Sequence, residues 1–195
     1  MHIAKAIKRQ KKSSRRFKIL MLFIFVLLPT MVLLMNMTEI FILAYLIFIE
    51  TLILLALIYR IKWERLQFSC YNNKLKYKYG LISKEFLILC DKVQLVHTEK
   101  LGDEIEIIII STVNFKNKNY KPITKAFLKK YPMASEEYIK IKKLNPENKF
   151  YFLIIRKGLL IKYELLDTIF RNCVKATYTT NAIENIKIAR GQKEI

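Results

Sequence analysis

Glu50 is the residue whose type and position most directly suggest chemistry. It is the eleventh residue of an apolar run of 20, Ile40–Tyr59, and Thr51 follows it. If this run crosses a membrane, the carboxyl lies near the bilayer midplane, where a charge costs at least about 2.5 kcal/mol. Such a group carries protons, binds a partner or forms a hydrogen bond across a helix interface. We expect the interface role, with Thr30, Thr51 or a second copy of the chain as partner, because the run contains no other charged residue to extend a proton relay.

The other reactive residue types do not form a recognisable active site or metal site. Cys70, Cys90 and Cys173 show no C-x-x-C spacing, and neither histidine has a Cys or His close by, so no zinc site is expected. Neighbouring residues of a strand point to opposite faces, so His97 and Thr98 would not meet as base and nucleophile. The four glycines form no phosphate-binding loop. We therefore expect a non-catalytic protein without a cofactor, in which the cysteines are buried thiols.

Two long apolar runs near the start of the chain predict a hairpin of two transmembrane helices. Ile19–Met35 has 17 residues and Ile40–Tyr59 has 20, and only residues 36–39 separate them. A spanning helix needs about 20 mostly apolar residues, so the second run is long enough and the first borrows from its flanks. Pro29 is expected to bend the first helix. A cleaved signal peptide is disfavoured, because the first run is longer than a signal's apolar core and lacks a small-residue cleavage site.

Basic residues outside both runs orient this hairpin. Residues 1–18 carry eight Lys or Arg and no acid, whereas the connecting turn carries only Glu39. Because Lys and Arg beside a span tend to remain in the cytoplasm, both termini are expected there, in a multi-pass protein of the cell membrane. Tyr59 and Trp63 lie where interfacial aromatic anchors are expected. The anionic inner leaflet attracts such cations by about 1 kcal/mol each. Lipid or partner contact is therefore expected for Lys8, Arg9, Lys11, Lys12, Arg15 and Arg16.

The chain is thus predicted to have three parts: a basic arm at 1–18, the hairpin at 19–59 and one cytoplasmic domain at 60–195. The arm is either a short interfacial helix or disordered. After the hairpin, apolar residues recur at the two-residue spacing that is typical of strands, and turns are predicted at Asn72-Asn73 and Gly80. These strands are expected to form an antiparallel meander: Leu66–Tyr71, Lys74–Tyr79, Glu85–Cys90, Lys92–Thr98 and Glu104–Val113.

The second half of the domain returns to regular structure at residue 150. Strands are predicted at Phe150–Ile155 and Leu159–Tyr163, followed by an amphipathic helix over Leu165–Cys173 that closes on the sheet. One more strand at 174–180 and a short helix at 181–190 complete the pattern. The predicted class is α+β: a transmembrane hairpin, then a mostly antiparallel β domain with a closing C-terminal helix and a helical insertion.

One segment resembles a known family. Residues 75–99 (LKYKYGLISKEFLILCDKVQLVHTE) look like the bacterial pleckstrin-homology-like (PH-like) domain that follows two transmembrane helices in small bacterial membrane proteins. The resemblance covers about residues 60–113 together with the hairpin, and it implies a PH-like cytoplasmic domain that ends in a helix. The matching positions are Tyr79, Gly80, Leu81, Ile82, Val93, Gln94 and Val96.

Residues 114–149 depart from this family pattern and are interpreted as the insertion. They are rich in Lys and hold three of the four prolines. A helical turn is expected over Thr124–Tyr131, and Ser135 is expected to cap a helix that ends at Asn145. Two roles remain open: a solvated connection, or a lipid or partner contact around the aromatic residues Tyr120, Phe127, Tyr131 and Tyr138. The lysines of that contact would be Lys121, Lys125, Lys129, Lys130, Lys140, Lys142 and Lys143.

The net charge of +19 and the hairpin together favour a function at the membrane. We expect a non-catalytic integral membrane protein whose basic domain docks on the inner leaflet and on a partner membrane complex. The alternative is a subunit of a transport, secretion or conjugation machine held by hairpin contacts through Glu50. The expected partners are anionic lipids, other membrane proteins or a second copy of the chain. Nucleic acid is not expected, because the anionic membrane accounts for the basic charge.

Overall fold

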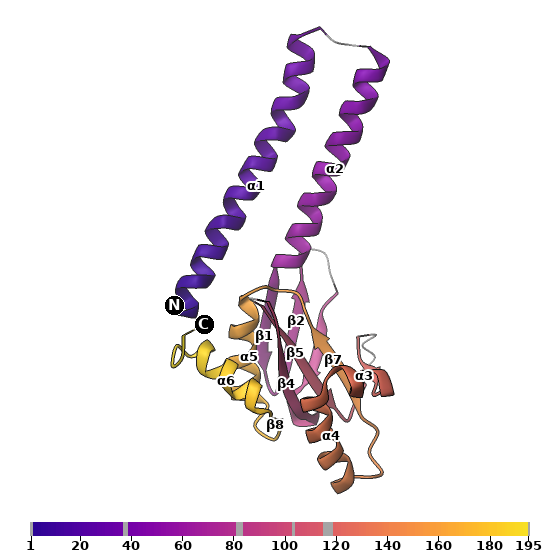
Figure 1. Ribbon diagram of the computed structural model, residues 1–195, viewed down its shortest axis with the longest axis vertical. Helices are drawn as coiled ribbons and strands as arrows, with labels where there is room; N and C mark the ends of the chain where they lie inside the picture. The colour runs from indigo at the N-terminus through magenta and orange to yellow at the C-terminus, as the bar shows by residue number, and fades with distance from the viewer. Residues whose placement is uncertain (1, 37–38, 81–83, 103, 115–118, 195) are drawn as a thin grey trace.

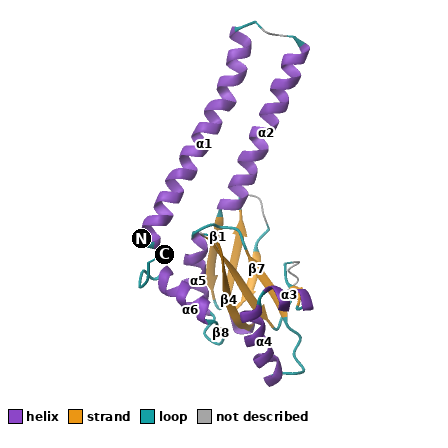
Figure 2. Ribbon diagram, viewed as in Figure 1, coloured by secondary structure: helices purple, strands orange, loops and turns teal. Residues whose placement is uncertain are grey.

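The computed structural model describes residues 2–36, 39–80, 84–102, 104–114 and 119–194. Two long helices rise from one end of an α+β domain (Figure 1). Figure 2 shows that strands form the middle of this domain and that helices cover it on two sides. The α+β class predicted from the sequence is thereby confirmed. Two positions of the family resemblance, Leu81 and Ile82, lie outside the described residues.

Helices α1 (Ile3–Leu34) and α2 (Ile40–Glu64) form the predicted hairpin. Each is long and apolar enough to cross a membrane, and an apolar window of 18 residues in each is not buried inside the molecule. The half-buried side chains of α2 recur three and four residues apart, as expected for the helix face that meets α1. Within the apolar run they are Ile42, Leu46, Ile49, Glu50, Ile53 and Leu57. An exposed apolar surface of this extent requires lipid or another protein to cover it.

The first residues of the chain continue α1 and do not form a separate arm. Ile3, Ala6 and Ile7 lie on one face of the helix and are each 5% exposed. Ile3 and Ile7 belong to the main core of the domain. Figure 1 shows α1 starting beside the end of α6 (Thr180–Ala189). Residues 3–18 are therefore helical, as one of the two expectations for residues 1–18 had it, and not disordered; the helix is continuous with the rest of α1, and its apolar face is buried in protein.

Sheet A follows α2 directly. It is antiparallel and contains β1 (Leu66–Tyr71), β2 (Lys74–Tyr79) and β3 (Phe86–Leu89). The predicted turn between β1 and β2 is confirmed: Asn72 and Asn73 have φ of 47° and 57°, and two-residue hairpin turns favour such positive values. Leu75 and Tyr77 of β2 are buried, and the lysines between and beside them are not. The alternation in β2 therefore directs its apolar side chains to the core.

Sheet B has β5 at its centre. Its spatial order is β6 (Lys121–Pro122), β7 (Tyr151–Ile155), β5 (Glu104–Ser111), β4 (Val93–Leu101) and β8 (Thr177–Tyr178). Neighbouring strands are antiparallel except β4 and β8, which are parallel. The sequence predicted one continuous meander. The chain instead changes sheet between β3 and β4, at the 3₁₀ turn η1 (Cys90–Lys92).

The predicted insertion forms a helical layer over sheet B. Its helices are α3 (Lys125–Lys130) and α4 (Pro132–Leu144). Ile107 and Ile109 of β5 belong to the main core, whereas Ile108 and Ile110 pack in a second cluster with Phe127 of α3. Because both faces of β5 are covered, its sequence is a nearly continuous apolar run. The insertion is thus part of the core, a role that neither interpretation of the sequence included.

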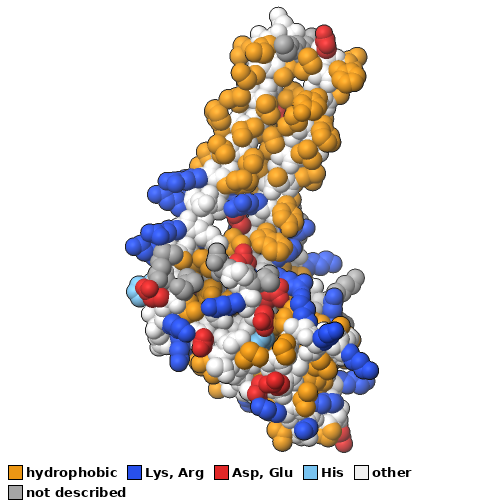
Figure 3. Space-filling model, in the orientation of Figure 1, with side chains coloured by type: hydrophobic (Ala, Val, Ile, Leu, Met, Phe, Trp, Pro, Cys, Tyr) orange, Lys and Arg blue, Asp and Glu red, His pale blue; other side chains and the backbone are white. Residues whose placement is uncertain are grey.

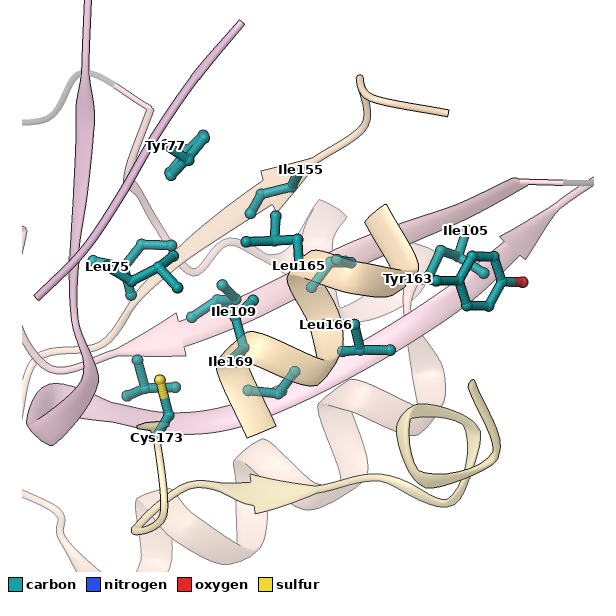
Figure 4. Packing of buried hydrophobic residues seen from close by; sticks show 14 of the residues in the cluster. Leu75, Tyr77, Ile105, Ile109, Ile155, Tyr163, Leu165, Leu166, Ile169 and Cys173 are labelled. Atoms are coloured by element: carbon teal, nitrogen blue, oxygen red, sulfur yellow. The ribbon is translucent and has the colours of Figure 1, made fainter. Parts of the chain in front are cut away.

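The main core lies between the two sheets and α5 (Ile161–Asn172). Figure 4 shows Leu165, Leu166 and Ile169 of α5 packed against sheet B, with sheet A beside them. Leu75 and Tyr77 contribute from sheet A, and both are at most 1% exposed. Since these side chains come from distant parts of the sequence, the core fixes the two sheets and α5 relative to one another.

The strand predicted at Leu159–Tyr163 is wrong. Gly158 and Leu159 have positive φ, 112° and 49°, and α5 begins at Ile161. Tyr163 then lies three residues before Leu166 on the buried face of the helix. A short apolar run is compatible with a strand or with a buried helix, and the turn at Gly158 selects the helix here.

The cap predicted at Ser135 is also wrong. Helix α4 begins at Pro132, whose fixed φ suits the first helical position. Ser135 lies inside the helix, and its hydroxyl donates to the carbonyl of Tyr131 at 2.7 Å. The other helix predictions near it are confirmed: Thr124 caps α3 through the backbone N–H of Phe127, and α4 ends before Asn145.

Candidate functional site

Glu64 holds the two long helices together where they reach the domain. Its carboxylate accepts hydrogen bonds from the hydroxyl of Ser14 and from Lys18 Nζ at 2.9 Å, both on α1. Arg60 Nε, one turn earlier on α2, donates at 2.6 Å. The Glu64 side chain is only 10% exposed, so these donors replace the water that the carboxylate would otherwise bind. We call these four residues, with the pocket beside them, the hairpin base.

The hairpin base is joined to the sheets by two close glycine contacts. Only Arg65 separates α2 from β1, and its carbonyl accepts the N–H of Gly80 at 2.8 Å. The N–H of Gly158 donates to the carbonyl of Trp63 at 2.9 Å. A Cβ on Gly158 would lie 2.6 Å from Leu66 Cδ2, so no side chain fits there. Helix α2 therefore continues into the domain without a flexible linker.

A pocket of about 410 Å³ opens at the hairpin base, between α1, α2 and the amino end of α5. Four cationic side chains line it, together with Glu64. The cations are Lys11, Arg15, Lys18 and Arg65. Gln10 connects α1 to α5 at its edge, because its Oε1 accepts the N–H of Leu160 at 3.3 Å. The arrangement can bind an anion at the level where the apolar part of the hairpin begins.

The structure places the expected lipid-contact residues of 1–18 on one helix, directly below the apolar part of α1. All six are exposed, and Lys11 and Arg15 among them line the pocket. Figure 3 shows Lys and Arg side chains gathered beneath the apolar surface of the hairpin. Tyr59 and Trp63, the expected interfacial anchors, stack with ring centroids 6.0 Å apart. Cations and aromatic rings therefore occur at the same end of the apolar surface.

Glu50 lies on the half-buried face of α2, away from the hairpin base. The structure does not pair it with Thr30 or Thr51, the two expected partners within the chain. The hydroxyl of Thr30 donates to the carbonyl of Leu27 at 2.8 Å, and that of Thr51 donates to the carbonyl of Ile47 at 2.8 Å. Both threonines thus satisfy their donors within their own helices.

The lysines of the insertion are largely exposed, but the aromatic residues expected among them are not. Phe127 and Tyr131 are at most 4% exposed and hold the insertion on sheet B. Lys142 Nζ donates to two backbone carbonyls after α4, and Lys140 pairs with Glu137 at 2.7 Å. Helix α4 lies at the end of the domain opposite the hairpin (Figure 1). Its lysines therefore face away from the hairpin base.

The fold brings the three cysteines together, which their sequence spacing did not suggest. The thiol of Cys90 interacts with those of Cys70 and Cys173 in and beside the main core, and all three are free thiols. Burial, and secondarily the neighbouring Cys90, raises the pKa of the Cys70 thiol to about 11. In the described part of the chain, no group of three or more His, Cys, Asp or Glu side chains is arranged to hold a metal ion. No local sequence signal links positions so far apart, because a tertiary fold creates the contact.

His97 is fully buried and bonded at both ring nitrogens. Nδ1 lies 2.8 Å from the hydroxyl of Thr179, and Nε2 lies 2.9 Å from Glu99 Oε2. Thr98 bonds a different residue, Asn185, whose amide donates to its hydroxyl at 2.8 Å. The separation of His97 and Thr98 expected from strand geometry is therefore present, and both side chains are bonded within the core.

Comparison of the chain with protein-family models, curated proteins and solved structures gives no match. The PH-like resemblance of residues 75–99 therefore has no support from these comparisons. The structure itself supports the coarser description, two long apolar helices followed by a sheet-containing domain.

Proposed function

We propose that this is a non-catalytic integral membrane protein whose hairpin holds a cytoplasmic domain at a fixed position under the inner leaflet. There, a basic surface of the insertion docks on a partner membrane protein. The observation that carries this proposal is the hairpin base. Glu64 ties α1 to α2, and Ile3 and Ile7 anchor the start of α1 in the core. A hairpin attached at two places transmits its orientation to the domain.

The cations below the apolar helices support docking on lipid. Juxtamembrane Lys and Arg are each attracted to an anionic leaflet by about 1 kcal/mol, and this attraction is screened by salt. The same cations favour a cytoplasmic location for the domain and both termini. A bacterial PH-like family assignment remains part of this proposal, on the resemblance of residues 75–99 alone.

The position of α3 and α4 supports docking on a protein and not on the same leaflet. Their exposed lysines form a basic surface on the insertion, and α4 lies at the far end of the domain from the hairpin (Figure 1). An acidic protein surface is the partner that such a charge favours. We call this surface the distal face; its residues are Lys125, Lys129, Lys140 and Lys143.

The test is affinity purification of the full chain in mild detergent, comparing two variants that each lose the same number of charges. The first replaces the four lysines of the distal face by Gln, and the second replaces Lys8, Arg9, Lys12 and Arg16 by Gln. We expect the first to reduce recovery of co-purifying membrane proteins at least fivefold while remaining in the membrane fraction. The second should keep them. Equal recovery in wild type and both variants would overturn the proposed docking on a partner.

A further inference from the structure

The pocket at the hairpin base has the size of a small-ligand site. Its volume of about 410 Å³ falls within the roughly 300–1,000 Å³ that is usual for such sites. Helices α1 and α2 form its sides, Leu159 contributes from the turn before α5, and Ile161 is the first residue of α5. The positive end of the α5 helix dipole therefore adds to the charge around the pocket.

Most of the positive charge in this pocket is not neutralised within the described residues. Glu64 is the acidic group in the lining, and it is already bonded to Ser14, Lys18 and Arg60. None of Lys11, Arg15 and Arg65 forms an ion pair with a described acidic residue. Lys11 and Arg15 are four residues apart on α1, a spacing at which like charges destabilise a helix by about 0.2–0.5 kcal/mol. A bound anion would relieve this repulsion and use all three cations.

The height of the pocket identifies the source of that anion. Lys18 immediately precedes the apolar run that begins at Ile19, and Ile61 lines the pocket one residue after Arg60. With the hairpin in a bilayer, the pocket lies at the level of the lipid headgroups. The surfaces of α1 and α2 above it are apolar and exposed, so they can accommodate acyl chains. A phospholipid can contact both the cationic pocket and the apolar helix surfaces above it, whereas a free phosphate ion can contact only the pocket.

We propose that the pocket at the hairpin base binds the phosphate headgroup of one anionic phospholipid of the inner leaflet, with Lys11, Arg15 and Arg65 as its ligands. Arg and Lys side chains recognise phosphate oxygens through charge-assisted hydrogen bonds. Basic pockets beside transmembrane helices on the cytoplasmic side are suited to such headgroups. The inference rests on the proposed function in one respect: the hairpin must lie in a membrane with this end in the cytoplasmic leaflet.

The experiment measures retained lipid and thermal stability on the full chain in mild detergent. Native mass spectrometry records lipid bound to the protein after purification, and the delipidated protein is then titrated with phosphatidylglycerol, phosphatidylcholine or inorganic phosphate while its melting temperature is followed. The test variant is K11Q/R15Q, and R65Q is a second, independent variant. The control is K5Q/K62Q, which also removes two positive charges, one from each helix of the hairpin, at positions outside the pocket lining.

For wild type and the control we expect one retained anionic phospholipid and a rise in melting temperature with phosphatidylglycerol but not with phosphatidylcholine. K11Q/R15Q and R65Q should each need at least ten times more phosphatidylglycerol to reach half of the full rise in melting temperature. Equal effects of the two lipids, or an equal loss in K5Q/K62Q, would overturn the site, and saturation by inorganic phosphate would show a free-anion site. If the headgroup site is wrong, recovery of the partner protein should still depend on the lysines of the distal face. Failure of the headgroup site can therefore be distinguished from failure of the proposed function.

Discussion

Cys70 lies against Cys90 at the edge of the main core, where its thiol is only partly exposed. Burial disfavours the thiolate, and the neighbouring thiol adds to this effect, so the pKa of Cys70 rises to about 11. The thiolate is the reactive form of cysteine. Cys70 is therefore protected from alkylation by its protonation state as well as by its partial burial.

We predict slow alkylation of Cys70 in the folded protein at pH 8. With a pKa of about 11, only about one thiol in a thousand is ionised at that pH, against roughly one in four for an ordinary cysteine. The rate should rise about tenfold for each pH unit up to pH 10. Iodoacetamide labelling followed by mass spectrometry measures it, with V174C as an exposed reference site, because Val174 is 80% exposed. Labelling of Cys70 as fast as that of V174C at pH 8 would show that its pKa is not raised.

Glu50 is the polar residue of the hairpin whose two expected partners within the chain, Thr30 and Thr51, donate hydrogen bonds elsewhere. Both threonines donate to carbonyls of their own helices. We therefore propose that Glu50 meets a second chain or a partner protein. We predict that E50L lowers the yield of the associated complex at least threefold, whereas E50Q, which keeps a hydrogen-bonding group, lowers it less. Quantitative mass spectrometry of the detergent-purified complex measures both. Unchanged copy number and yield in E50L would remove the interface role.

At the scale of elements, the contact between Gly158 and Leu66 connects the turn before α5 to the first strand of sheet A. The N–H of Gly158 also bonds the carbonyl of Trp63 near the end of α2. Three elements therefore meet at a residue with φ of 112° and no room for a side chain. This contact keeps α2, β1 and α5 in fixed positions around the pocket.

We predict that G158A destabilises the protein by about 3 kcal/mol or more. A Cβ would lie 2.6 Å from the Leu66 side chain, which is overpacking, and the positive φ adds backbone strain. Gly102 supplies a control without the contact: its φ of 63° lies in the left-handed region that other residues enter at modest cost, and nothing lies within 4 Å of an added Cβ. G102A should therefore cost only about 1–2 kcal/mol. Thermal unfolding of both variants measures the difference, and equal losses would show that the contact with Leu66 is not limiting.

The sequence predicted elements well where a local signal determined them. The alternation in β2, the Asn72-Asn73 turn and the apolar runs of α1 and α2 act over neighbouring residues, and these predictions are confirmed. The division into two sheets was not predictable in the same way, because it depends on which distant strands pair. The continuous apolar run of β5 did indicate burial, but not that the insertion covers one face.

The candidate site was predictable only in part for the same reason. The Arg60–Glu64 pair is four residues apart on one helix, a spacing that sequence alone reveals. The bonds from Ser14 and Lys18 to Glu64 cross between helices and depend on how the hairpin closes. The contact among the three cysteines likewise arises only when β1, the turn η1 and the end of α5 meet in the core.

At the scale of the whole molecule, the hairpin and the domain are attached at both helices. Helix α2 continues into β1 after one residue, and α1 is held by its apolar start and by the bonds to Glu64. A single attachment would allow the domain to rotate relative to the hairpin, whereas two attachments oppose that rotation. Under the proposed function, the orientation of the distal face relative to the bilayer then depends on the hairpin base.

We predict that E64A loosens the domain relative to the hairpin without unfolding it. Lys18 and Arg60 are 37% and 42% exposed, so water can solvate them when the carboxylate is removed, while the apolar contacts of Ile3 and Ile7 remain. Pulsed electron paramagnetic resonance between spin labels at Leu34 and Val174, both largely exposed, should show a broader distance distribution in E64A than in wild type.

E184A is the control, because it removes a surface ion pair with Lys193 in which both side chains are more than half exposed. The control should keep the narrow distribution of wild type. An equally narrow distribution in E64A would mean that α2 and the core contacts of α1 alone fix the orientation, and the charge cluster at the hairpin base would then serve only to complete the pocket.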